Sequence, residues 1–135
     1  MRIASAVVSL VGLVYAWMIY FVPPTDEFAV VNHPWQPDVR HMHVWSAPLL
    51  VFALGILWRT HAWRRLSADH PESQRSGRIL LSSCVPMIAS GYLIQTSLNP
   101  FWERVWIATH LLASGLWVLG YLIHEGGLLK QRFSP

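Results

Sequence analysis

The sequence predicts an all-α integral membrane protein, a four-helix up-down-up-down bundle with both termini in the cytoplasm. Hydrophobic residues make up 53% of the chain and charged residues 13%, whereas a soluble domain has about 25% charged residues. Four apolar stretches each approach the roughly 20 residues that cross a bilayer. We therefore expect one domain over residues 1–135, with helices over about 3–22, 40–65, 78–98 and 103–124.

The first helix, over 3–22, is expected to stay in the protein rather than to be removed as a signal peptide. It is long for the apolar region of a signal peptide, and the FVPPTDEF segment at its end lacks an A-x-A-like cleavage site. The loop that follows, PPTDEFAVVNHPWQPD, contains four prolines, which should keep residues 23–38 out of a helix. Because long loops often cover a site or a partner surface, we expect this loop to fold over the outer end of the bundle.

The second and third helices each contain one proline, Pro48 and Pro86, which neighbouring helices can tolerate as a kink. The single cysteine, Cys84, is expected to be a small buried apolar residue. The third helix also carries a run of small residues. These are Ser82, Ser83, Ser90, Gly91 and Ser97. Small residues let helix backbones approach closely, so this run predicts a helix-packing face, with room for a flat cofactor as a second use.

Positive charges alternate between the connections and predict the orientation of the helices. The amino end, the second connection and the tail together hold eight of the ten Lys and Arg residues, and the other two connections hold only Arg40 and Arg104. Cytoplasmic loops are enriched in Lys and Arg. We therefore expect a multi-pass protein of a bacterial-type inner membrane, surrounded by lipid, whose basic charge sets its topology and does not bind nucleic acid.

The histidines are concentrated on two of the four helices. Of the seven, none lies in the first or third helix, whereas His43 and His61 bracket the second and His110 and His124 the fourth. In an up-down-up-down bundle these two helices run in the same direction, so the four imidazoles would form an outer and an inner pair. At 3.6 residues per turn, the two histidines of each helix lie within about 40° of one face, while His41 lies about 160° from His61.

Two separate pairs of imidazoles fit haem iron better than zinc. Haem iron takes an axial histidine from each of two facing helices. Zinc requires three or four ligands at one point, and the two pairs lie roughly 20 Å apart along the helix axes. The sequence shows no hydrolase nucleophile elbow, phosphate loop or paired intramembrane carboxylate, so we do not expect catalysis by the side chains themselves.

Four membrane helices with two histidines on the second and two on the fourth resemble the haem-binding bundle of cytochrome b in the cytochrome bc complexes, and the small b-type anchor subunits of respiratory enzymes. The resemblance implies two haem b groups, an outer one held by His43 and His110 and an inner one held by His61 and His124. The family spaces each pair on a helix by about fourteen residues, as in His110 to His124. The step from His43 to His61 is longer by about 6 Å of rise, so a single haem is the alternative.

The resemblance also implies a function in transmembrane electron transfer. The chain would relay electrons between a quinone pool and a partner on the outer, periplasmic face, a cytochrome c, iron–sulfur or molybdenum protein, as an electron-transfer subunit rather than a stand-alone enzyme. Arg40 and Arg104 are the expected cations for haem propionates, and Gly91 and Gly115 the expected places where a porphyrin lies against the backbone. The alternative function is a cofactor-free membrane scaffold or assembly subunit of a larger complex.

Overall fold

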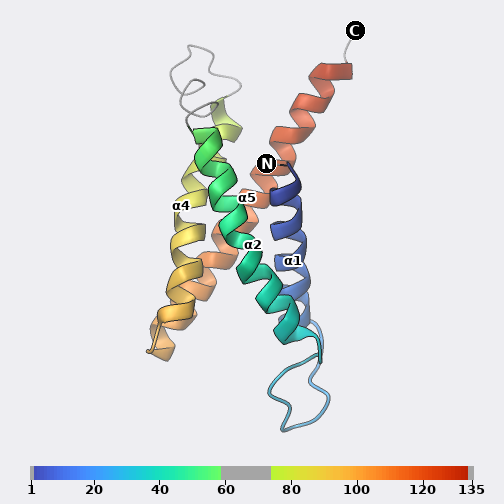
Figure 1. The fold of residues 1–135 in the computed structure, drawn as a ribbon, viewed down its shortest axis with the longest axis vertical. Coiled ribbons are helices and arrows are strands. Elements are labelled where there is room, and N and C mark those ends of the chain that lie inside the picture. Colours follow the sequence, from blue (N-terminus) through green and yellow to red (C-terminus); the bar gives the residue numbers. More distant parts are fainter. Residues whose placement is uncertain (1, 59–73, 134–135) are drawn as a thin grey trace. The chain divides into compact units, whose positions relative to one another are not determined.

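The computed structural model describes residues 2–58 and 74–133, which form four helices and no strand (Figure 1). The helices are α1 (Arg2–Tyr20), α2 (Gln36–Leu57), α4 (Gln74–Thr96) and α5 (Pro100–Phe133). The chain divides into two compact units, one containing α1 and α2 and the other α4 and α5. The prediction of an all-α chain with four long helices is thus confirmed.

Every helix contains a segment that is long and apolar enough to cross a membrane. These segments are Ile3–Tyr20, Gln36–Leu57, Arg78–Thr96 and Pro100–His124. Many large apolar side chains on the helices are exposed, among them Trp45 at 81%, Leu112 at 71% and Val85 at 69%. Such surfaces are unusual on soluble proteins, whereas lipid tails are as apolar as the side chains that face them. The four helices are therefore those expected of a multi-pass membrane protein.

Several helix boundaries differ from the prediction; α4, for example, begins at Gln74 rather than near residue 78. The prolines were expected to exclude helix up to residue 38, but α2 begins at Gln36, because Pro37 lies in its first turn, where a backbone N–H needs no helical partner. At the other end of the chain α5 continues to Phe133 rather than ending near 124. Its 34 residues span about 50 Å, more than the roughly 30 Å of a hydrocarbon core, so its last turns would extend beyond the membrane.

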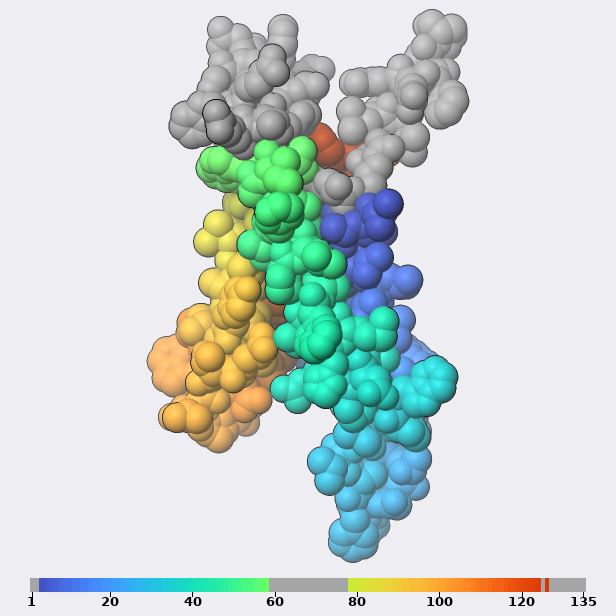
Figure 2. All heavy atoms as spheres, in the orientation of Figure 1, coloured from blue at the N-terminus to red at the C-terminus, as the bar shows by residue number. Residues whose placement is uncertain are grey.

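Hydrogen bonds of Asn32 hold the connection between α1 and α2 in place. Its Nδ2 donates hydrogen bonds to the carbonyl oxygens of Ile19 at 2.8 Å and Met18 at 3.3 Å, and its backbone N–H donates to Gln36 Oε1 at 2.9 Å. Asn32 therefore joins the last carbonyls of α1, which lack partners within the helix, to the first turn of α2. The light-blue atoms of the loop extend past the ends of these two helices (Figure 2). The loop was expected to fold over the end of the bundle, but within its own hairpin it extends the two helices and does not cover their ends.

The α4–α5 hairpin is antiparallel and packs through small residues. Asn99 begins α5, since its Oδ1 accepts the backbone N–H of Phe101 at 2.9 Å, as an N-cap residue does. On α4, Ser83 and Ser90 are buried, at 5% and 1% exposure, whereas Ser82 is exposed. The expected close-packing face of this helix therefore includes Ser83 and Ser90. Cys84, expected to be buried, is only partly so.

Candidate functional site

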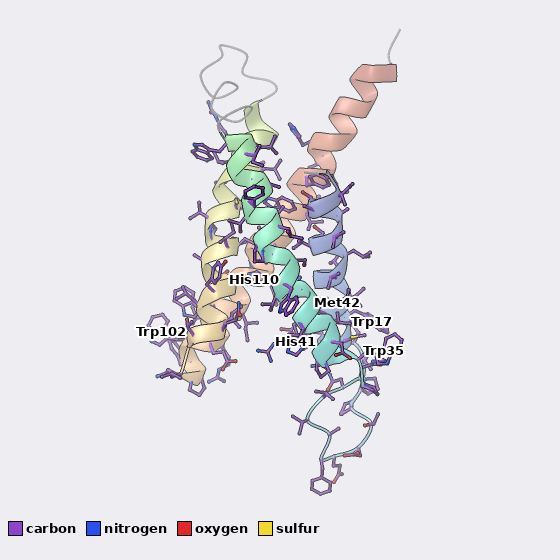
Figure 3. All side chains as sticks on the ribbon, in the orientation of Figure 1. Trp17, Trp35, His41, Met42, Trp102 and His110 are labelled. Carbon is purple, nitrogen blue, oxygen red and sulfur yellow. The ribbon has the colours of Figure 1, made fainter. Side chains whose placement is uncertain are left out.

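His110 of α5, labelled in Figure 3, is held by α4 through its Nδ1 atom. This nitrogen lies 2.9 Å from the carbonyl oxygen of Met87 and 3.3 Å from Ser90 Oγ. A carbonyl oxygen can only accept a hydrogen bond, so the proton of the neutral imidazole is on Nδ1. The other ring nitrogen, Nε2, then carries the lone pair with which a histidine binds a metal.

Ser90 and Met87 form a buried polar support for this ring. Ser90 is 1% exposed and Met87 8%. Ser90 Oγ donates to the carbonyl oxygens of Met87 at 3.1 Å and Pro86 at 2.5 Å, within its own helix. The Ser90 hydroxyl group therefore contacts carbonyl oxygens of its own helix and Nδ1 of His110. These contacts fix the orientation of the imidazole.

Gly91 allows the His110 ring to approach the backbone of α4. A Cβ atom at position 91 would lie 3.2 Å from His110 Cε1 and 3.4 Å from Nδ1. The distance to Cε1 is shorter than ordinary van der Waals contact between carbon atoms, about 3.5–4.0 Å. The structure thus brings together two of the predicted site residues, the glycine and the histidine, although the contact is with the imidazole rather than with a cofactor.

His43 has a similar position in the other hairpin. Its ring, which is partly buried, lies against α1 at Gly12, where a Cβ atom would be 2.7 Å from His43 Cε1 and 3.1 Å from Nδ1. One turn further along α2, Ser46 Oγ donates to the carbonyl oxygen of His43 at 2.9 Å. His41 is exposed, as expected of a residue about 200° around the helix from His43.

In both hairpins, therefore, a histidine of the second helix rests with its Cε1–Nδ1 edge on a glycine of the first. The sequence analysis assigned no role to Gly12. The available signal was the glycine itself: in the middle of the apolar run SLVGLVY, far from any turn or cap, a glycine suggests close approach of another segment. Contact between the two helices was needed to identify that segment as His43.

The other predicted site residues are His61, His124, Gly115, Arg40 and Arg104. His124 is partly buried on α5, and His61 lies outside the described residues. Gly115 is exposed, and a Cβ atom there would meet nothing within 4 Å. Arg40 and Arg104 are both exposed, and Arg104 Nε donates at 3.2 Å to a carbonyl oxygen of its own helix, four residues earlier.

The chemistry of His110 fits an axial ligand of haem. A ligating histidine usually donates its second ring N–H to a carboxylate, a backbone carbonyl or water, which fixes the tautomer and the ring direction, and Met87 supplies such a carbonyl. His43 shares the glycine contact.

No protein-family model matches this chain, and no curated protein or solved structure matches it either.

Proposed function

We propose that the protein is a membrane b-type cytochrome that relays electrons between a quinone pool and a redox partner on the outer face of a bacterial-type inner membrane. In this proposal the two hairpins associate as a four-helix up-down-up-down bundle with both termini in the cytoplasm. His43 and His110, one from each hairpin, are the ligands of the outer haem. His61 and His124 hold an inner haem, and a chain with the outer haem alone is the variant of this proposal.

The hydrogen bond from His110 Nδ1 to the Met87 carbonyl is the observation that carries the proposal. His110 lies inside the candidate span Pro100–His124, and ionisable side chains within a membrane are costly and usually functional. The carbonyl keeps the proton on Nδ1, so that Nε2 carries the lone pair that would bind iron. Bound haem would supply a one-electron carrier, while the chain's own part is to orient the imidazole and to surround it with apolar side chains.

The positions of Lys and Arg support two parts of the proposal. These are the orientation of the chain in the membrane and the location of the haem propionates. The excess of Lys and Arg in the second connection and at the two ends predicts that these parts are cytoplasmic. Arg40 and Arg104 are exposed near the N-terminal ends of α2 and α5, which are the outer ends in the proposed orientation. Charge-assisted hydrogen bonds from guanidinium to carboxylate are strong, so these two residues are the proposed partners of the outer haem's propionates.

One observation favours a second candidate function, a cofactor-free membrane scaffold. The His110 ring already has its contacts within one hairpin, with the Met87 carbonyl, with Ser90 and with Gly91. A histidine that only joins two helices would make the same contacts, since hydrogen-bonding side chains commonly link membrane helices. The two functions therefore differ in what Nε2 binds.

The visible absorption spectrum of the purified protein distinguishes the two functions. We expect protein purified from haem-replete cells to show a reduced-minus-oxidised spectrum of the b type and a pyridine haemochrome signal. The haem-to-protein ratio then separates one haem from two, and repeating it with His61→Ala tests the inner ligand pair. A folded, colourless protein from such cells would contradict the cytochrome proposal and support the scaffold.

A further inference from the structure

We propose that Gly12 and Gly91 are positioning residues that set the ring orientations of His43 and His110, so that each hairpin carries its own prearranged histidine. The ligand role of the two histidines rests on the proposed function. The glycine contacts themselves lie within single hairpins and are observed in each of them independently.

At Gly12 any side chain would have to displace the His43 ring. A Cβ atom there would be 2.7 Å from His43 Cε1, 3.1 Å from Nδ1 and 3.5 Å from Nε2, so the whole edge of the ring faces the α1 backbone. Such an approach is too close for two carbon atoms. The imidazole is the far end of a side chain with two rotatable bonds, so in Gly12→Ala the ring would turn while the helices stay in place. Ligand direction should change more than fold stability.

At Gly91 the fit between the ring and the helix backbone is slightly looser than at Gly12. A Cβ atom would lie 3.2 Å from His110 Cε1, and the ring is also bound to the Met87 carbonyl at 2.9 Å. The added methyl group of Gly91→Ala would displace the ring by a smaller distance. The two variants should therefore affect their histidines to different degrees, with Gly12→Ala the stronger.

The chain offers matched controls for both substitutions. Gly55 in α2 and Gly126 in α5 are also helical, and a Cβ atom at either would meet nothing within 4 Å. All four substitutions gain helix propensity of about 1 kcal/mol, so a difference between the test pair and the control pair reports contact with the ring. Far-UV circular dichroism of each variant verifies that the helices form.

Two measurements test the inference on the full-length protein in detergent. In the apoprotein, NMR of labelled histidine rings should show the His43 signals shifted in Gly12→Ala and the His110 signals shifted in Gly91→Ala, with both unchanged in Gly55→Ala and Gly126→Ala. In the haem-loaded protein, Gly12→Ala should shift the low-spin ferric EPR signal, which depends on the orientation of the ligand rings, and should weaken haem binding about 10-fold.

Different results overturn different steps of the inference. Ring signals that do not move in either test variant would contradict the glycine contacts. Ring signals that move while the EPR signal and the haem affinity stay at their parent values would refute the positioning role and leave the cytochrome proposal standing. A parent protein that binds no haem overturns both proposals, and this is seen before any variant is made. If Gly12→Ala does not accumulate, Gly91→Ala supplies the same comparison.

Discussion

Replacing His110 with asparagine separates its role in packing from its proposed role as a ligand. The asparagine amide can place an N–H group near the position of imidazole Nδ1, but it has no atom at the position of Nε2. The hydrogen bond to the Met87 carbonyl, 2.9 Å long in the parent, can therefore be kept while the ligand atom is removed. We expect His110→Asn to fold as the parent does and to lose the outer haem.

His110→Leu is the matched control, because it removes both the ligand atom and the hydrogen bond. One such bond contributes about 1 kcal/mol in water and about 0.6 kcal/mol between membrane helices. The carbonyl oxygen of Met87 keeps a second donor, Ser90 Oγ at 3.1 Å, so no buried acceptor is left without a partner. The free energy of unfolding should thus fall by about 0.6–1 kcal/mol in His110→Leu, and by less in His110→Asn.

Thermal unfolding in detergent, followed by far-UV circular dichroism, measures the stability of the two variants. The apoproteins are compared, because bound haem would itself stabilise the folded state. Pyridine haemochrome assays of protein from haem-replete cells then give the haem content. If His110→Asn kept the haem content and spectrum of the parent, the assignment of Nε2 as a ligand would be wrong. A loss of several kcal/mol in His110→Leu would show that packing of the ring, rather than one hydrogen bond, dominates its contribution.

Three further predictions concern other parts of the two hairpins. His43→Ala should lose the outer haem while His41→Ala, on the opposite and exposed side of α2, keeps it, as measured by haem-to-protein ratio; equal losses would refute the division between the two histidines. Asn32→Ala removes the hydrogen bonds to the last turn of α1 and should lower the free energy of unfolding by about 1–2 kcal/mol, so an unchanged thermal transition would contradict this role. Trp117 is 2% exposed and stacks on Tyr121 with ring centroids 5.6 Å apart. Trp117→Ala should therefore cost about 3–5 kcal/mol, against about 0.5 kcal/mol or less for Trp45→Ala at an exposed position.

Much of the fold follows from local properties of the sequence. A stretch of roughly 20 apolar residues is long enough to span a bilayer as a helix, whatever it packs against, and four such stretches predicted the four helices. Their ends were less predictable. The start of α2 depends on where Pro37 falls relative to the first turn, and α5 continues because residues beyond the span, such as Leu129 and Lys130, also favour helix.

The candidate site could be predicted only in part. Spacing and depth identified His110 as a residue with a special role, and the structure gives it a buried carbonyl and a buried hydroxyl as partners. The sequence could not rank the glycines, since Gly91 and Gly115 are equally plausible places for a close approach. Only Gly91 has a ring against it, while the Cβ direction of Gly115 is open.

The sequence by itself determined the number of helices and which of them carry histidines, because helix formation and apolarity are properties of consecutive residues. The tertiary structure decided that Nδ1 of His110 is the protonated nitrogen and that Gly12 supports His43. It also decided that Asn32 fastens the first hairpin. These features depend on atoms separated by thirteen or more positions along the chain, which only the packing of one helix on another brings within contact distance.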